Sequence, residues 1–186
     1  MTRQKKRLFG LRKTRLASDQ SGIAAVEFAL ILPLMLLLYF GGVEIMQAVM
    51  VNRLVDLAAT TVTNLTAQYT TISASLQMPD ILKASTQVMA PYPTTTVKVV
   101  VTCITIDGQG NATVGWSQAS ANATALTLGQ AVTVPASLKV AGTSLILGTV
   151  SYAYSPGFDF MKIGPFNLSS QVYMSPRAST TVNLAN

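Results

Sequence analysis

Residues 21–42, "SGIAAVEFALILPLMLLLYFGG", decide how this chain folds, because they place one glutamate in an otherwise apolar run. The eighteen residues 23–40 carry Glu27 as their single charge. As an α-helix this run is about 27 Å long, close to the thickness of the hydrocarbon layer of a membrane. A carboxylate in that layer costs roughly 2 to 3 kcal/mol. The position of Glu27 therefore requires a specific explanation.

The sequence after this run keeps helical character but becomes amphipathic. Val43, Met46, Met50, Leu54, Leu57 and Val62 recur at steps of three to five residues, with polar residues between them. We predict one long helix from about Ser21 to Tyr69, apolar all round in its first half and amphipathic in its second. Pro33 removes one backbone hydrogen bond and is expected to kink or locally open this helix.

The first 22 residues carry the whole net charge of the chain. They hold seven Lys and Arg against one Asp, whereas residues 23–186 hold six charges of each sign. Positive charge beside a membrane span stays on the cytoplasmic side, so we expect the N-terminus inside and the remainder outside. One alternative is nucleic-acid binding, which the apolar run following the basic segment disfavours. Another is an ordinary secretory signal, which the lack of a polar break after Gly42 disfavours.

After the long helix the chain is expected to form one short helix and then strands. The short helix starts near Pro79 and ends before Pro91. Residues 94–120, "TTTVKVVVTCITIDGQGNATVGWSQAS", indicate a β-hairpin. Up to three further strands are expected in residues 130–138, 144–156 and 166–184. The face of the hairpin buried against the long helix is expected to carry Val97, Val99, Val101 and Cys103.

The fold class predicted from these elements is α+β. A long N-terminal membrane-spanning helix extends into an amphipathic half, which packs on a small antiparallel β-sheet. Trp116, Tyr152 and Tyr154 are expected to pack in the core or across strands rather than to form an adhesive surface.

Composition argues against enzyme chemistry. The chain has no histidine and one cysteine, Cys103, which removes the commonest general base, a Ser-His-Asp triad, a disulfide and a paired-cysteine zinc site. Asp107 in "DGQGN" is expected to be a turn residue, because the later acids of a calcium loop are missing. We expect no enzyme, no metal and no cofactor, and a buried Cys103.

The residues around Glu27 resemble the cleavage motif of type IV prepilins. In that motif a small residue precedes the cut, a glutamate stands fifth after it, and an aromatic residue follows. Gly22, Ile23, Glu27 and Phe28 take these places after a basic leader. With the early Pro33, the pattern looks most like the TadE/TadG-like pseudopilins of the Tad branch. The segments "VTCITIDGQGNATVGWSQA", "SLILGTVSYAYSP" and "QVYMSPRAS" also look like the extracytoplasmic part of that family.

This resemblance implies that a prepilin peptidase cuts the bond between Gly22 and Ile23. The new α-amine of Ile23, with a pKa of about 7.7 to 8, is mostly protonated at neutral pH. It is expected to pair with the Glu27 carboxylate of its own or a neighbouring subunit. Glu27, Phe28 and Pro33 are thus the expected assembly residues. The alternative for Glu27 is that it lies close enough to the cytoplasmic interface to reach water.

The periodicity and the resemblance together predict four parts. Residues 1–22 are a leader removed by the peptidase, and residues 23–42 are the transmembrane and pilin-core helix. Residues 43–92 hold the amphipathic continuation and the short second helix, and residues 93–186 form an extracytoplasmic antiparallel β domain.

The implied function is that of a minor pilin or pseudopilin of a Tad-type (type IVb) pilus, which initiates, caps or supports pilus biogenesis in adherence. The implied partners are the inner membrane, other pilin or pseudopilin subunits, the prepilin peptidase and the pilus assembly platform, with no nucleic acid. The implied location is a single pass through the bacterial inner membrane with the C-terminal domain periplasmic, or the extracellular pilus. The alternatives are an uncleaved, N-in envelope protein whose outer domain binds a partner or surface, and a secreted binding protein.

Overall fold

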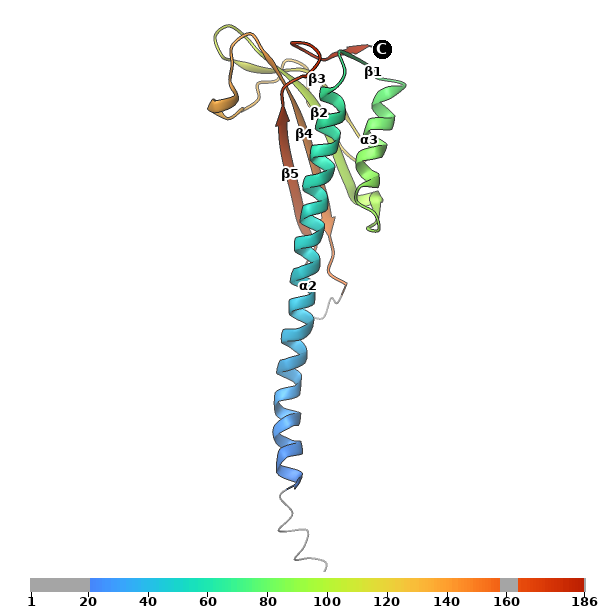
Figure 1. Cartoon of the computed structure of the whole chain (residues 1–186), viewed down its shortest axis with the longest axis vertical. Coiled ribbons are helices and arrows are strands. Elements are labelled where there is room, and N and C mark those ends of the chain that lie inside the picture. The colour runs from blue at the N-terminus through green and yellow to red at the C-terminus, as the bar shows by residue number, and fades with distance from the viewer. Residues whose placement is uncertain (1–20, 158–163, 186) are drawn as a thin grey trace, which may run out of the picture. The chain divides into compact units, whose positions relative to one another are not determined.

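The computed structural model describes residues 21–157 and 164–185, so residues 1–20 of the predicted basic leader lie outside the described part. The chain divides into two compact units, residues 1–45 and 46–186. The α+β fold class is confirmed (Figure 1). In chain order the helices and strands are α2 (Ser21–Ala67), β1 (Thr71–Ser73), α3 (Gln77–Gln87), β2 (Val97–Ile106), β3 (Ala112–Ala119), β4 (Ser144–Tyr154), β5 (Phe166–Met174) and β6 (Asn183–Ala185).

Helix α2 confirms the predicted long helix. It has 47 residues and ends at Ala67, two residues before the expected end at Tyr69. It remains one helix through Pro33, although a proline donates no hydrogen bond to the carbonyl four residues before it. At the C-terminal end, the Ala67 carbonyl accepts a hydrogen bond from the backbone N–H of Arg177 at 2.9 Å, which satisfies a group that the helix leaves open.

The main sheet has four antiparallel strands in the order β3-β2-β4-β5. The predicted hairpin is confirmed as β2 and β3, with a register shift between Cys103 and Ile104. Gly115 is the extra residue at this bulge, since Ile104 pairs with Val114 and Cys103 with Trp116. Strand β4 pairs with β2 on one side and with β5 on the other.

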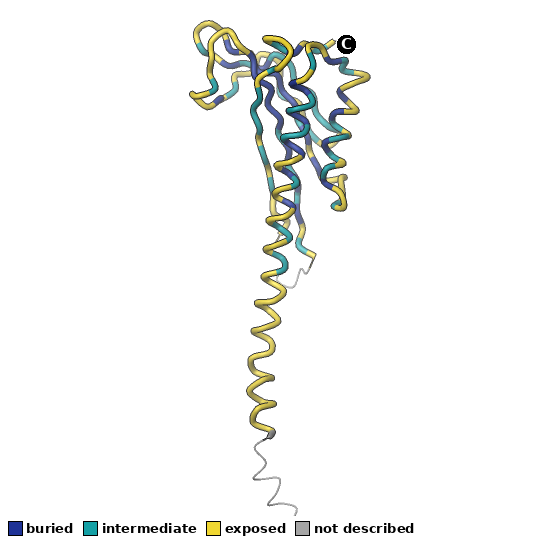
Figure 2. The backbone as a smooth tube through the Cα atoms, in the orientation of Figure 1, coloured by how far each residue is buried: buried dark blue, intermediate teal, exposed yellow. Residues whose placement is uncertain are grey.

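The core lies between residues 46–67 of α2 and one face of this sheet (Figure 2). The alternating residues Val97, Val99, Val101 and Cys103 are all buried in that cluster, which confirms the predicted face of β2. Burial raises the pKa of the Cys103 thiol above its usual value, although a contact with the Thr181 hydroxyl opposes the shift. Tyr152 and Tyr154 are buried as well, so the packing interpretation of these aromatic residues is confirmed.

The buried face of α2 shares only Val62 with the row of apolar residues seen in the sequence. Its buried members are small or β-branched: Val51, Val55, Ala58, Ala59 and Val62. Of the sequence row, Met46, Met50 and Leu57 are exposed. The reason is a close approach of the helix to β4. A Cβ on Gly148 would collide with the Thr63 hydroxyl and lie 2.9 Å from Val62 Cγ1 and 3.0 Å from the Ala59 carbonyl oxygen.

One predicted strand is wrong. Residues 130–138 form a single bridge, between Ala131 and Thr113, followed by a 3₁₀ turn at Ala136–Leu138. Pro135 lacks the N–H that a continuing ladder would need. The segment nevertheless covers part of the β3 edge, because Val114 donates to the Gln130 carbonyl at 2.9 Å. The short helix α3 is confirmed, and it begins at Gln77, two residues before the expected Pro79.

The segment 166–184 holds two strands rather than one, and the second belongs to a different sheet. Strand β6 pairs in parallel with β1 in a separate two-stranded sheet, which was not predicted. Residues 177–185, which we call the C-terminal strap, bond to several elements. The Val182 carbonyl accepts from Trp116 Nε1 at 2.7 Å, and the Thr180 carbonyl accepts from the Ser144 hydroxyl at 2.7 Å.

Replacing Trp116 with phenylalanine is expected to loosen the C-terminal strap. The substitution leaves the buried Val182 without its indole donor, at a cost of about 1 to 3 kcal/mol. The midpoint of urea unfolding should fall, and the Cys103 thiol next to Thr181 should be alkylated faster. Gln118→Ala, on the same strand, is the control and should change neither. An unchanged alkylation rate in Trp116→Phe would contradict this role of the indole.

Candidate functional site

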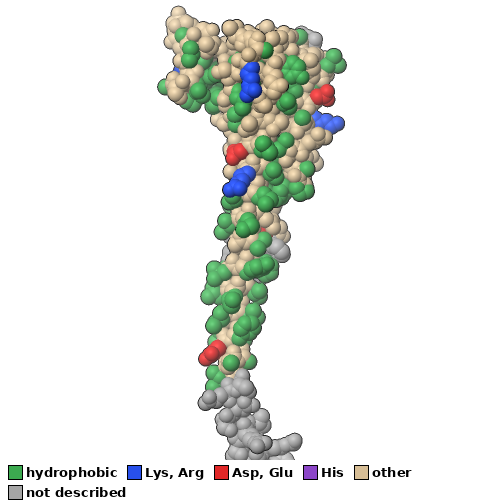
Figure 3. Space-filling view, in the orientation of Figure 1, with side chains coloured by type: hydrophobic (Ala, Val, Ile, Leu, Met, Phe, Trp, Pro, Cys, Tyr) green, Lys and Arg blue, Asp and Glu red, His purple; other side chains and the backbone are tan. Residues whose placement is uncertain are grey.

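The first unit presents an apolar helix that no described part of the chain covers. Every residue from 22 to 42 is exposed, and Figure 3 shows apolar side chains along this length. The helix Gly22–Ala67 is long and apolar enough to cross a membrane, and none of its most apolar window is buried. The core helix of a soluble protein would be mostly buried. This exposure suggests a single-pass membrane anchor.

All five residues predicted for processing and assembly lie on this helix. Gly22, Ile23, Glu27, Phe28 and Pro33 are within α2, and all are exposed. Ile23 and Glu27 are four positions apart, so they lie on the same side of the helix, about 6 Å apart along its axis. No ion pair joins Glu27 to any residue in the described ranges, 21–157 and 164–185. Glu27 is therefore available to a cation that the described chain does not supply.

An aromatic pair lies near the other end of the apolar run. The rings of Tyr39 and Phe40 meet edge to face, with centroids 5.4 Å apart and an interplanar angle of 74°. Aromatic rings with one polar tip are typical of the boundary between membrane and water. The pair agrees with a span over residues 23–40.

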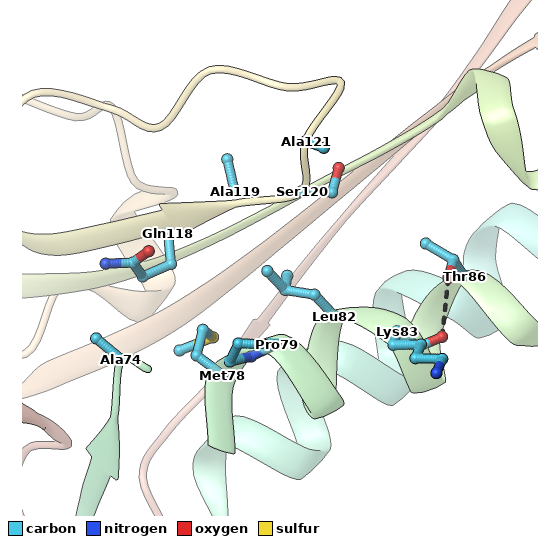
Figure 4. A pocket seen from close by; sticks show the side chains of 10 residues that line it. All are labelled: Ala74, Met78, Pro79, Leu82, Lys83, Thr86, Gln118, Ala119, Ser120 and Ala121. Carbon is cyan, nitrogen blue, oxygen red and sulfur yellow. Dashed lines mark hydrogen bonds between the residues drawn. The ribbon is translucent and has the colours of Figure 1, made fainter. Parts of the chain in front are cut away.

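A groove in the second unit shows no catalytic set. It lies between α3 and the end of β3, with Met78, Leu82 and Lys83 on the helix side (Figure 4). Gln118 and the three residues after it line the other side. Lys83 is the single ionisable residue in this lining. The lining offers neither a nucleophile with a base nor a pair of carboxylates.

The Asp107 carboxylate closes the β2–β3 turn. It accepts hydrogen bonds from the Asn111 side chain at 2.8 Å, the Asn111 backbone N–H at 2.8 Å and the Gln109 backbone N–H at 2.9 Å. These bonds, that of the Asn111 side chain first, lower the pKa of Asp107. The turn interpretation is confirmed. Among the described residues, no three His, Cys, Asp or Glu side chains gather in a way that could hold a metal ion.

The outward face of α2 beyond the apolar run is the feature that sequence reasoning missed. Met46, Met50 and Leu57 were visible as a regular row, but the pattern did not tell whether the sheet covers them. In the structure they are exposed. The small size of Ala58 and Ala59 on the opposite side was the available signal, because small side chains permit the closer approach.

Comparison with known proteins identifies the helix. Residues 22–63 match the family model described as TadE-like protein. No curated protein and no solved structure matches the chain. The match begins at Gly22, includes Ile23, Glu27, Phe28 and Pro33, and ends inside α2. The TadE/TadG-like assignment made from the sequence is therefore confirmed over residues 22–63, which form most of the long N-terminal helix.

Proposed function

We propose that this chain is a minor pilin or pseudopilin of a Tad-type pilus, made as a membrane-inserted precursor and cut between Gly22 and Ile23. The TadE-like match already suggests a Tad pilus-associated protein, and TadE-like pilus proteins are structural rather than enzymatic. The observation that carries the finer proposal is the start of the match at Gly22, on a helix whose apolar side chains are all exposed over residues 22–42. A helix of that kind must be covered by lipid or by other helices.

Cleavage supplies the cation that Glu27 lacks. The α-amine of Ile23 would begin the mature helix one turn before the Glu27 carboxylate, so pairing within one chain or between adjacent chains is within reach. In the apolar layer an unpaired member of such a pair is costly, at roughly 3 to 5 kcal/mol. Helix packing supplies the affinity in this scheme, and the pair of charges selects the register.

The second unit is the part that would lie outside the cytoplasm. Removal of 22 residues leaves a mature chain of 164, most of which belongs to the second unit, residues 46–186. A subunit with so large an outer domain fits an initiating, capping or accessory position better than the repeated body of a fibre. Adherence would then depend on this outer domain.

The N-terminal residue of the mature protein tests the proposal. A start at Ile23 in normal cells, with a start at Met1 or Thr2 in cells that lack the prepilin peptidase, is the expected result. A start at Met1 or Thr2 in both strains would instead indicate an uncleaved envelope protein. A start near Val43 in both would indicate an ordinary secreted protein. Either of these last two outcomes would refute the cleavage step.

A further inference from the structure

The outward face of α2 in the second unit carries an apolar stripe that no described residue covers. Met46, Val49, Met50 and Leu57, which we call the outer stripe, are 71%, 49%, 55% and 53% exposed. Arg53 lies at the centre of this face, because positions three, four and seven apart lie on one side of a helix. The sheet covers the opposite side of the same helix.

The hydrocarbon layer ends before the outer stripe when residues 23–40 span the membrane. That span takes up about 27 Å of a hydrocarbon layer about 30 Å thick. The stripe begins six residues later, about 9 Å farther along the helix. Large apolar side chains grouped there mark a surface that another protein covers. The TadE-like match runs to residue 63 and so includes the whole stripe.

Charge on the same face selects the occupant and its register. Arg53 and Asp56 are both exposed, and no ion pair joins either of them to another residue in the described part of the chain. A second copy in the same register would place Arg53 opposite Arg53, and the repulsion between these like charges disfavours that register. A copy shifted by three residues sets Arg53 against Asp56 instead. The same shift places Met46 level with Val49 of the neighbour.

We propose that the outer stripe docks helix α2 of a second copy of this chain, parallel and shifted by three residues, about 4.5 Å along the axis. The inference rests on the proposed function, because a shared membrane orientation keeps the two helices parallel. Met46, Met50, Arg53 and Leu57 follow one another at steps of four, three and four, the spacing at which the side chains of paired helices interdigitate. Arg53 of one copy meets Asp56 of the other, so the two copies contribute different residues to the contact, and the pair covers the outer stripe of both.

Cysteine pairs test the shift. Two differently tagged full-length copies, one with Met46→Cys and the other with Val49→Cys, are produced together and oxidised mildly in the membrane. The mixed disulfide is expected to exceed either same-site disulfide by about fivefold, because bridging requires Cα atoms within roughly 7 Å. The unsubstituted chain is the control. Its single cysteine, Cys103, is 1% exposed and should give no dimer.

Charge reversal tests the pair. Placed in both copies of the cysteine assay, Arg53→Glu or Asp56→Arg sets like charges opposite each other and is expected to lower the mixed disulfide about tenfold. The double variant Arg53→Glu/Asp56→Arg inverts the pair and should restore it. Lys83→Glu, on exposed α3 surface away from the stripe, is the matched control and should have no effect.

The outcomes separate this inference from the proposed function. Same-site disulfides as abundant as the mixed one, or no recovery in the double variant, would overturn the shifted contact. The absence of every disulfide would overturn docking of a second copy. In that case a mature N-terminus at Ile23 would leave the proposed function standing, whereas failure of the proposed function would show as a different N-terminus.

Discussion

Replacing Glu27 with alanine is expected to abolish most incorporation of this protein into pili while leaving cleavage and membrane insertion largely intact. The substitution leaves the α-amine of Ile23 without its carboxylate in an apolar layer, at a cost of roughly 3 to 5 kcal/mol for each docking event. An energy of that size lowers the docking equilibrium by more than about a hundredfold. The measurement is the amount of this protein in sheared pili relative to the amount in the membrane.

Two variants make the Glu27 result specific. Glu27→Gln keeps the shape of the side chain but loses its charge, so it should fail nearly as fully as alanine. Asp80→Ala removes an exposed carboxylate from α3 and should leave incorporation unchanged. Normal incorporation of Glu27→Ala would show that Glu27 lies close enough to the interface to need no partner, and the assembly role would be withdrawn.

Replacing Gly148 with alanine is expected to destabilise the second unit by about 3 kcal/mol, at the upper end for overpacking. The added methyl group would collide with the Thr63 hydroxyl and lie 3.0 Å from the Ala59 carbonyl oxygen. Neither atom moves freely. The Ala59 carbonyl belongs to the backbone of α2, and the Thr63 hydroxyl donates a hydrogen bond to that carbonyl at 2.6 Å. Urea unfolding of the full chain in detergent measures the loss.

The matched control for Gly148 is Gly108→Ala. A Cβ at Gly108 has no atom within 4 Å, so that substitution should be nearly neutral. In the double variant Gly148→Ala/Thr63→Ala the nearest obstacle is gone, and part of the stability should return. The recovery should be incomplete, because the Val62 and Ala59 contacts remain. Equal stability of Gly148→Ala and Gly108→Ala would contradict the close approach of helix and strand.

The elements whose formation depends on residues close together in the sequence were predictable. The extent of α2 and the hairpin of β2 and β3 follow from apolar periods of three to four and of two, which local backbone geometry imposes. The candidate site was predictable for the same reason. Gly22, Ile23, Glu27, Phe28 and Pro33 form a local motif, and the structure adds that all five are exposed on one helix. Their roles in processing and assembly involve other molecules, so a single chain does not test them.

Features that depend on distant segments were not predictable. The parallel pairing of β1 with β6 joins Thr71 to Asn183, and no local pattern encodes such a contact. Residues 130–138 have the composition of a strand but cover the edge of β3 instead, where Pro135 ends the pairing. In both cases the pairing depends on which backbone N–H and C=O groups the rest of the fold leaves without a hydrogen-bond partner.

The sequence by itself determined a long helix whose apolar half carries a single carboxylate, Glu27, within a motif that resembles a cleavage site. These properties depend only on residues that are close together in the sequence. Only the tertiary structure decided which side of that helix faces the sheet. Hydrophobicity alone favours Met46, Met50 and Leu57 for the core, but Gly148 lets β4 approach so closely that only small side chains such as Ala58 and Ala59 fit between them. The larger residues are thereby left outside, where they form the surface on which assembly is proposed to depend.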